Sequence, residues 1–266
     1  MNLTNKVVWI TGASSGIGEA IATQLAKEGC KLILSARRTN ELELVKNNLT
    51  TNNQQVFVLP IDLEQHQQAE EWTKKALTAF GKIDILINNG GISQKSFALS
   101  TNTATEQKIM NINYFGNVAL SKAVVPVMQK QKSGKIVVIT SILGKFGLPE
   151  LTTYAASKHA LYGFYDSLRL EHIKDNIQIL LVAPGFINTN AAINAVKGDG
   201  TIVNENSDAQ RNGMSTSVFA KKLVKAIQSN KKHIYIGSKE LLSVPFKTLF
   251  PNTFYSIMLK MSSKKK

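Results

Sequence analysis

The sequence predicts an α/β fold with one parallel, doubly wound sheet of about seven strands and helices on both faces. Two observations lead to this prediction. Short, continuously apolar runs, as expected of strands buried on both faces, alternate with longer segments of helical pattern. A glycine-rich loop joins the first apolar run to the first helical segment. Strands that alternate with helices form parallel sheets, because each helix carries the chain back across the sheet.

Seven apolar runs are the expected strands, at 6–11, 31–35, 56–59, 84–87, 135–140, 177–182 and 233–236. The pattern between them predicts helices, among them one that ends near Gly29, one over 40–49, and a long one over about 104–130. No internal repeat or linker interrupts the series. We therefore expect one domain over residues 1–240, followed by a basic and apolar tail over 241–266 that Pro251 divides into two short helical pieces.

The loop after the first strand has a composition suited to binding phosphate. It reads Gly12-Ala13-Ser14-Ser15-Gly16-Ile17-Gly18 and leads directly into a helical pattern. Glycines let backbone N–H groups approach a pyrophosphate at a helix N-terminus. The spacing is G-x-x-x-G-x-G, which differs from the common G-x-G-x-x-G, and a plain turn before a helix is the alternative. The flanking strand and helix favour a dinucleotide-binding loop and hence a Rossmann-type fold.

A tyrosine and a lysine one helical turn apart form the expected catalytic pair. Tyr154 and Lys158 lie in a run without proline that extends to Lys174, so both side chains share one helix face. Thr152 or Thr153 is the expected N-cap, which puts Tyr154 in the first turn. The ammonium and the positive helix end should lower the pKa of the phenol from ~10 towards neutrality. Two unrelated surface residues are the alternative reading.

The remaining polar motifs favour the catalytic reading, because each follows a predicted strand. They are the glycine loop, Asp62, Asn88–Gly91 (NNGG), Ser141 and Pro184-Gly185. The carboxyl ends of parallel strands meet at one edge of a sheet, and ligands bind in the crevice there. Residues spread over more than 170 positions are therefore expected to converge on a single site.

Composition narrows the class of protein. With 266 residues, 43% of them hydrophobic, the chain can bury a full core. No apolar run is long enough to span a membrane, and the N-terminal residues do not have the pattern of a signal peptide. Cys30 is the only cysteine, which fits a reducing compartment, so a cytoplasmic location is expected. The four histidines show no metal-ligand spacing, and no metal site is expected.

The net charge of +14 is concentrated near the C-terminus. From Ser217 onward the chain has 11 lysines against one acid, Glu240, a net charge of +10. Nucleic-acid binding is an alternative that we set aside, because no nucleic-acid-binding motif is present. Large apolar residues recur among the tail lysines, which suits the interface of an anionic membrane. Packing on the core or a subunit contact are the other two readings of the tail.

Taken in order, the motifs resemble those of the short-chain dehydrogenase/reductase family. The matching segments run from residue 6 to about 189 and are TGASSGIG, Asp62, NNGG, Asn113, Ser141, YAASK and PGFINT. One departure is Gly90, where the family's usual NNAG has alanine. Several further segments (NYFG, LGKFG, YAASKHAL and KGDG) look closest to the dehydrogenase/reductase member 7-like branch, several members of which are membrane-associated and act on lipophilic carbonyls and alcohols.

The resemblance implies a role for each of four residues. Tyr154 would donate the proton in carbonyl reduction or accept it in alcohol oxidation, and Lys158 would lower its pKa and bind the nicotinamide ribose. Ser141 would hold the substrate oxygen where negative charge develops. Asn113 would fix a water that relays protons to Lys158. Asn111 is the rival to Asn113, but the spacing of Asn113 to Gly116 fits the family better.

By the same resemblance, residues from several strand ends would bind the cofactor. Thr189 would contact the carboxamide, Asp62 the adenine, and Asn89 and Gly90 the cofactor backbone. The full expected set is Gly12, Ser14, Ser15, Gly16, Ile17, Gly18, Arg37, Arg38, Asp62, Leu63, Asn89, Gly90, Tyr154, Lys158, Pro184, Gly185, Ile187 and Thr189.

The cofactor preference follows from charge. NAD enzymes of this layout carry an acid at the end of the second strand, about 20 residues after the glycine loop, to bind the ribose hydroxyls. The chain has Arg37 and Arg38 there, which can clamp a 2′-phosphate and offer no carboxylate to repel it. We therefore expect NADP(H).

The expected function is NADP(H)-dependent interconversion of a carbonyl and an alcohol on a lipophilic small molecule. A 3-oxoacyl-thioester reductase and a non-catalytic dinucleotide sensor are the alternatives. Residues 186–216 are the expected substrate loop, because apolar and polar residues alternate there as in a lid over an apolar pocket: Ala191, Ile193, Ala195, Val196, Ile202 and Val203. A homodimer or homotetramer is expected.

Overall fold

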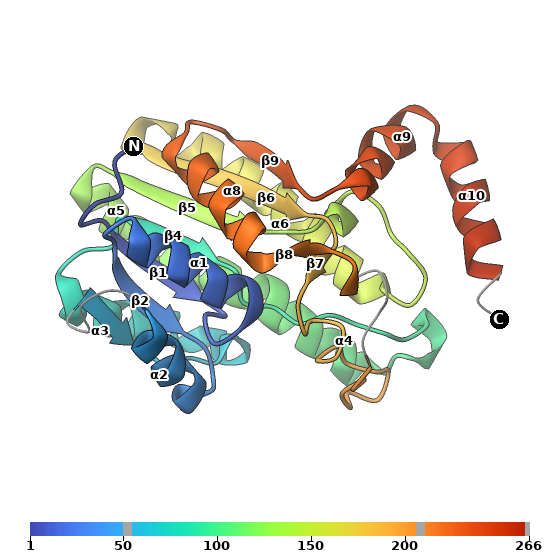
Figure 1. Ribbon diagram of the computed structural model, residues 1–266, viewed down its shortest axis with the longest axis horizontal. Coiled ribbons are helices and arrows are strands. Elements are labelled where there is room, and N and C mark those ends of the chain that lie inside the picture. Colours follow the sequence, from blue (N-terminus) through green and yellow to red (C-terminus); the bar gives the residue numbers. More distant parts are fainter. Residues whose placement is uncertain (50–54, 206–210, 264–266) are drawn as a thin grey trace.

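Seven parallel strands form the central sheet of the computed structural model, which describes residues 1–49, 55–205 and 211–263 (Figure 1). They lie in the order β3-β2-β1-β4-β5-β6-β9. Their bounds are β1 Val7–Thr11, β2 Lys31–Ser35, β3 Val56–Val58, β4 Ile85–Asn88, β5 Gly134–Ile139, β6 Ile177–Pro184 and β9 His233–Ile236. The predicted Rossmann-type sheet is confirmed, and its strand order reverses between β1 and β4, where a crevice opens in such folds.

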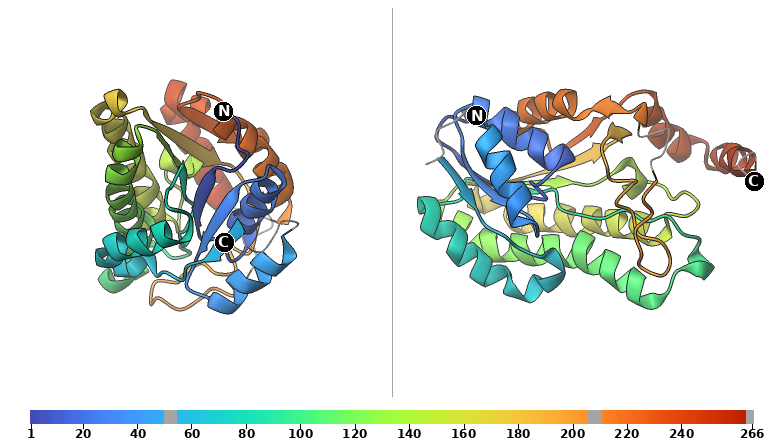
Figure 2. Two further views of the ribbon diagram at one scale, coloured as in Figure 1. Left: turned by 90° about the vertical axis from the view of Figure 1, so that its left-hand side faces the viewer. Right: turned by 60° about the horizontal axis from the view of Figure 1, so that its bottom comes forward.

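Helices cover both faces of the sheet, as the edge-on view in Figure 2 shows. One layer consists of α1 (Gly16–Lys27), α2 (Thr39–Asn48) and α8 (Thr216–Gln228), and the other of α3 (Ala69–Phe80), α5 (Asn117–Gln131) and α6 (Thr152–Glu171). Val8 and Ile10 of β1 belong to the core cluster under the first layer, whereas Val7 and Trp9 belong to the cluster under the second. This strand is continuously apolar because both of its faces are buried.

The predicted strands agree with the observed ones to within two residues at each end. β2 and β9 match at both ends. The largest difference is at β6, which continues to Pro184 because Pro184 still pairs with Ile236 of β9. The end of α1 also agrees, since Gly29 follows it with a φ of +77°, a conformation that glycine adopts without strain.

The predicted helical segment over about 104–130 is confirmed in its extent, but its middle is π-helical, which was not predicted. The chain forms α4 (Thr103–Met110), then a π-helical segment (Asn111–Gly116), then α5. Within this segment the Asn117 side chain donates to the carbonyl oxygen of Asn113 at 2.7 Å. Apolar spacing could not reveal this segment, because side-chain amides stabilise it.

The C-terminal tail folds as two helices, α9 (Ser243–Leu249) and α10 (Pro251–Ser263), which extend away from the body (Figure 1). The division at Pro251 is confirmed. Phe254 anchors α10, since it is only 1% exposed and its ring lies edge-on to Phe146 with centroids 5.1 Å apart. Within the described residues, none of the helices has both the length and the apolarity needed to cross a bilayer.

The expected substrate loop contains two short strands that pair with each other, β7 (Ile187–Asn188) and β8 (Met214–Ser215). Within the loop, Val203 N donates to the carbonyl of Ala195 at 2.9 Å, which folds the segment into a hairpin-like turn. Ala195, Val196 and Val203 are buried as expected, whereas Ile202 is half exposed. Residues 206–210 of the predicted loop, like Lys264–Lys266 of the tail, lie outside the described residues.

Candidate active site

The glycine loop approaches the β4 segment so closely that side chains would not fit. Gly12 has a φ of +65°, and a Cβ there would lie 2.9 Å from the side-chain nitrogen of Asn89 and from the Cα of Gly90. Gly16, with a φ of +61°, begins α1. Ser15 stands at the N-cap but makes no side-chain capping bond. The first N–H groups of α1 are therefore available to an anion.

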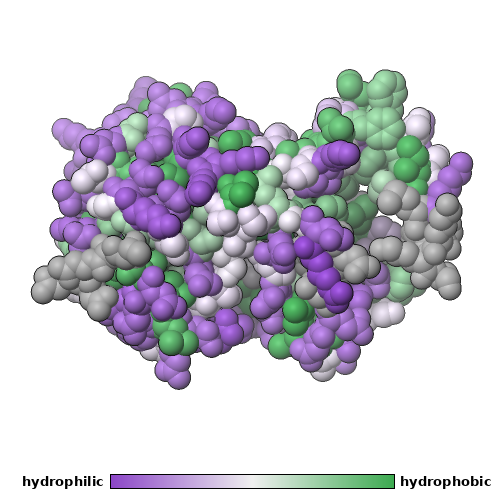
Figure 3. Space-filling view, viewed as in Figure 1, coloured by the Kyte–Doolittle hydropathy of each residue, from purple (hydrophilic) through white to green (hydrophobic). Residues whose placement is uncertain are grey.

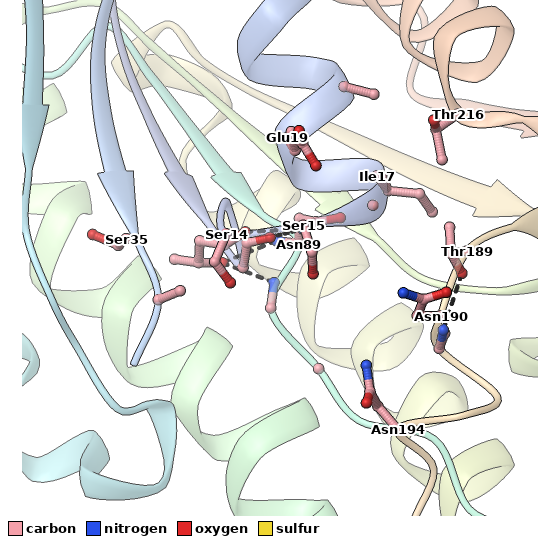
Figure 4. Close-up of a pocket in the computed structure, with 18 of the residues that line it drawn as sticks. Ser14, Ser15, Ile17, Glu19, Ser35, Asn89, Thr189, Asn190, Asn194 and Thr216 are labelled. Atoms are coloured by element: carbon pink, nitrogen blue, oxygen red, sulfur yellow. Dashed lines mark hydrogen bonds between the residues drawn. The ribbon is translucent and has the colours of Figure 1, made fainter. Parts of the chain in front are cut away.

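Beside this loop lies a cavity of about 950 Å³ at the carboxyl edge of the sheet. Figure 4 shows it between the Ser14–Ile17 turn, Asn89 and the segment from Thr189 to Asn194. Twelve of the predicted cofactor residues line it: Gly12, Ser14, Ser15, Gly16, Ile17, Arg37, Arg38, Asp62, Leu63, Asn89, Gly90 and Thr189. Its volume, its uncapped helix end and its two arginines fit a dinucleotide.

Six predicted cofactor residues do not line this cavity: Gly18, Tyr154, Lys158, Pro184, Gly185 and Ile187. Gly18 instead allows α1 to pack on the loop, because a Cβ there would collide with the carbonyl oxygen of Gly12. Gly185 makes room for the Glu240 carboxylate, which accepts hydrogen bonds from Phe186 N at 3.0 Å and Ser238 N at 2.9 Å. These glycines thus shape the backbone around the site.

Thr11 organises the segment after β4, a role that was not predicted from the sequence. Its hydroxyl oxygen accepts from Asn89 N at 3.0 Å and from Gly90 N at 2.9 Å. The Asn89 side chain donates back to the carbonyls of Thr11 and Gly12. A threonine as the last residue of a strand before a glycine loop was the available signal.

Ser141 and Tyr154 meet at the end of β5. Ser141 follows the strand, and its side-chain oxygen accepts from Leu143 N at 3.1 Å, while its hydroxyl also bonds to the Tyr154 phenol. Tyr154 sits in the first turn of α6, as predicted. Burial nevertheless raises the pKa of Tyr154, and the Ser141 hydrogen bond only partly offsets this. The expected lowering is therefore wrong, because desolvation of the phenolate outweighs the favourable groups nearby.

Lys158 lies one turn further along α6 and is 5% exposed. Its ammonium donates to the carbonyl of Ile139 at 3.0 Å and lies 5.7 Å from the centre of the Tyr154 ring. Burial lowers the pKa of Lys158 to about 8. The pair therefore consists of a protonated phenol and a lysine that can gain or lose a proton near neutral pH.

Asn113 is completely buried, whereas its rival Asn111 is partly exposed. The Asn113 side chain accepts from Ile92 N at 2.8 Å and donates to Ile92 O at 2.9 Å and to the hydroxyl of Ser157. It also borders the same space as Lys158. A Cβ on Gly91 would lie 3.0 Å from the Asn113 amide oxygen and 3.6 Å from the Lys158 nitrogen.

The predicted threonine cap of α6 is wrong. The helix begins at Thr152, and Leu151 at the cap position offers no side-chain bond. Gln94, from the loop after β4, replaces it: its side-chain oxygen accepts from Thr153 N at 2.9 Å and from Tyr154 N at 3.0 Å. A glutamine 60 residues upstream carries no cap signature, so sequence reasoning could not find it.

The other side of Tyr154 is apolar. A buried cluster of Ile142, Leu143, Phe146, Ala155 and Phe254 packs beside it, joined by partly buried Leu241, Val244, Phe246 and Met258 of the tail. The tail thus packs in the same apolar cluster as Tyr154. Among the described residues, no group of three or more histidine, cysteine or acidic side chains could hold a metal ion.

Comparison with known proteins gives a family model, a related sequence and two solved structures. The short chain dehydrogenase family model matches residues 6–200. The "Dehydrogenase/reductase SDR family protein 7-like" of Anopheles gambiae is 41% identical over 269 residues, which cover 99% of this chain and 85% of that protein.

Two solved structures share the fold. The short chain dehydrogenase/reductase of Burkholderia phymatum, in complex with NAD, has a TM-score of 0.83 at 24% identity, covering 93% of this chain and 94% of that one. The alcohol dehydrogenase of Thermococcus sibiricus, complexed with 5-hydroxy-NADP, has a TM-score of 0.75 at 24% identity. The match covers 88% of this chain and 97% of that one.

Proposed function

The chain belongs to the short chain dehydrogenase family, an oxidoreductase family that acts on CH–OH groups, and from this premise we propose an NADP(H)-dependent enzyme that interconverts a carbonyl and an alcohol on a lipophilic small molecule. One observation carries the proposal. Ser141, Tyr154 and Lys158 are assembled at one strand end, with the phenol bonded to the serine hydroxyl and the lysine one turn away.

Each residue has a distinct task. A bound nicotinamide dinucleotide would supply or accept the hydride. Ser141 holds the substrate oxygen, and Tyr154 donates its phenolic proton to that oxygen as the alcohol forms. Lys158 lies close enough to stabilise the phenolate that remains. Asn113 holds the Ile92 segment, which lines the cofactor cavity, against α6.

The preference for NADP(H) rests on Arg37 and Arg38. Both follow β2 and line the cavity, and Arg38 reaches the hydroxyl of Ser14 in the glycine loop at 3.4 Å. Two guanidinium groups beside a phosphate-binding loop attract the additional 2′-phosphate.

The lipophilic substrate class rests on the apolar cluster beside Tyr154. A substrate carbonyl that reaches Ser141 and Tyr154 has aromatic and aliphatic side chains of the tail and of the Ile142–Phe146 segment next to it. Burial of the substrate's apolar surface against these side chains would be the main source of affinity. Burial raises the pKa of Tyr154, so the phenol carries the proton that carbonyl reduction requires.

The test is consumption of NADPH and NADH with a panel of lipophilic ketones, retinals, steroids and 3-oxoacyl thioesters. We expect turnover of a lipophilic carbonyl with NADPH, and loss of about 10²–10⁴-fold in Tyr154→Phe with NADPH binding retained. Turnover of acyl thioesters alone would establish the alternative reductase. Binding of cofactor without turnover of any carbonyl would indicate a dinucleotide sensor.

We further propose that the tail rests on an anionic membrane surface from the cytoplasmic side. Large side chains are exposed along the tail: Leu242, Leu249, Phe250, Tyr255, Ile257 and Leu259. Figure 3 shows hydrophobic surface gathered over α9 and the turn into α10. Lysines accompany them and no acid follows Glu240, the combination that anionic head groups attract.

The structure changes how this membrane contact is best tested. Truncating the tail would remove Phe254 and uncover the wall beside Tyr154. Exchanging Leu249 and Leu259 for glutamine alters side chains that are 69% and 70% exposed, and the buried Phe254→Leu exchange is the matched control. We expect wild type and the control to sediment with anionic vesicles at low salt and the double variant to stay in solution. Wild type that remains in solution would rule the contact out.

A further inference from the structure

The catalytic helix depends on a distant side chain for its first turn. The N–H groups that open a helix have no partners within the helix. In α6 the cap position, Leu151, makes no side-chain bond to them. The N–H groups of Thr153 and Tyr154 instead donate to the side-chain oxygen of Gln94. One of these two groups belongs to the backbone of the catalytic tyrosine itself.

The amide of Gln94 is held on both sides. Its nitrogen donates to the hydroxyls of Ser96 and Thr101, both at 3.2 Å, and the residue is 2% exposed. An amide oxygen that accepts two N–H groups cannot be exchanged with the amide nitrogen, which only donates. The side chain therefore has one orientation, and this orientation is transmitted to the start of α6.

The same segment is tied to the substrate loop. The backbone of Gln94 forms a bridge with Val196: Val196 N donates to Ser93 O at 3.0 Å, and Lys95 N donates to Val196 O at 2.9 Å. On its other side, Ser96 N donates to Glu150 O at 3.0 Å, just before α6. Gln94 thus lies between the loop expected to cover the substrate and the helix that carries the proton donor.

We propose that Gln94 is a positioning residue for the reaction: it holds Tyr154 in place by capping α6, and it does so without adding negative charge beside the phenol. This inference rests on the proposed function of Tyr154. Serine, threonine, asparagine and aspartate are the common caps, and a carboxylate here would oppose formation of the phenolate. A neutral amide caps the helix and leaves the positive helix end to act on the phenol.

Among the residues that the structure describes, two charged groups lie near Tyr154. Lys158 lies on the same helix. Glu106 of α4 accepts from the Thr153 hydroxyl at 3.3 Å. The α9–α10 tail and the Ile142–Phe146 segment contribute apolar contacts to the cluster beside Tyr154. A carboxylate added at position 94 would therefore change the electrostatic environment of the phenol substantially, because only Lys158 and Glu106 among the described residues contribute charge there.

Two variants separate positioning from charge. Gln94→Met removes both acceptor bonds while nearly conserving volume, and we expect kcat to fall about 10–100-fold with the KM for NADPH unchanged. Gln94→Glu keeps an acceptor oxygen and adds charge. It should restore most of kcat for reduction at pH 7 and move the alkaline limb for alcohol oxidation up by about one pH unit.

The matched control is Gln131→Met. Gln131 likewise uses its amide on backbone groups, accepting from Ile83 N at 3.1 Å and donating to Ile83 O at 2.9 Å, but at the far end of α5. We expect a comparable loss of thermal stability and a kcat within about twofold of wild type. Equal losses of activity in the Gln94 and Gln131 methionine variants would mean that Gln94 serves only general stability.

A direct titration makes the outcome independent of turnover. Protein labelled at the tyrosine ring carbon is titrated by NMR with and without NADP⁺, and Tyr154→Phe identifies the Tyr154 signal. We expect the Tyr154 titration to begin about one pH unit higher in Gln94→Glu than in wild type. An unchanged titration, or Gln94→Met with wild-type kcat, refutes the proposal. If wild type turns over no carbonyl, the proposed function fails while the titration still decides the role of Gln94. If Gln94→Met does not fold, Gln94→Glu decides alone.

Discussion

Replacing Lys158 with methionine should inactivate the enzyme and stabilise its fold. The ammonium is 5% exposed, and burial lowers its pKa from 10.5 to about 8. At 1.36 kcal/mol per unit, holding this group charged inside the protein costs about 3 kcal/mol at pH 7. Methionine removes that cost and leaves the carbonyl of Ile139 without the 3.0 Å hydrogen bond, a loss of about 1 kcal/mol. The expected net gain is about 2 kcal/mol.

The pH dependence has a definite sign. Because the pKa of Lys158 is lower in the folded protein than in the unfolded chain, the unfolded chain binds more protons between pH 8 and 10.5. Stability contributed by this group therefore rises with pH in that window. The penalty is complete below pH 8, so the advantage of Lys158→Met should be largest at pH 7 and should shrink towards pH 10.

Urea unfolding of cofactor-free protein at pH 7, 8, 9 and 10 measures this difference. Lys135→Met is the matched control, because Lys135 is also buried with a lowered pKa but donates to two carbonyls, Ile227 O at 2.6 Å and Ser229 O at 2.8 Å. We expect that control to gain no stability and to keep its turnover. A Lys158→Met protein less stable than wild type at pH 7, or a gap that does not narrow with pH, would refute the reasoning.

Two further predictions concern the cofactor and the tail. Arg37→Ala should weaken NADPH about 10–150-fold and NADH little, measured by fluorescence titration. The control is Thr11→Val, which removes the acceptor for Asn89 N and Gly90 N and should weaken the binding of both cofactors alike. If Arg37→Ala also weakened NADPH and NADH binding equally, the proposed phosphate role of Arg37 would be contradicted. Phe254→Ala should release α10, since a buried phenylalanine contributes about 3–5 kcal/mol. Hydrogen exchange over 251–263 should then become fast, and an unchanged exchange rate would contradict the anchoring role.

The sheet and the glycine loop were predictable because their signals are local. A strand buried on both faces must be continuously apolar, as Val7 to Thr11 is. Gly12 must adopt a positive φ, and only glycine does so without strain. The convergence of Ser141 with Tyr154 then followed from topology, since parallel strands present their carboxyl ends at one edge.

Several features of the site depend on contacts that no local pattern encodes. The π-helical turn that buries Asn113 is stabilised by the side chain of Asn117. Glu240, an isolated acid in a basic segment, accepts the N–H groups of Phe186 and Ser238. Phe254 belongs to the apolar cluster beside Tyr154, although the sequence of the tail fitted membrane contact, core packing and a subunit contact. Each contact joins groups whose separation in the chain has no fixed value.

The sequence by itself determined the order of the strands and helices, the glycine loop and the helical spacing of Tyr154 and Lys158, because these depend on residue type and on short, fixed intervals. Only the tertiary structure decided the direction of the pKa shifts and the cap of the catalytic helix. The pKa of Tyr154 rises because burial removes water from its phenolate, and the cap comes from Gln94, 60 residues away. Desolvation and long-range hydrogen bonds are properties of the packed chain.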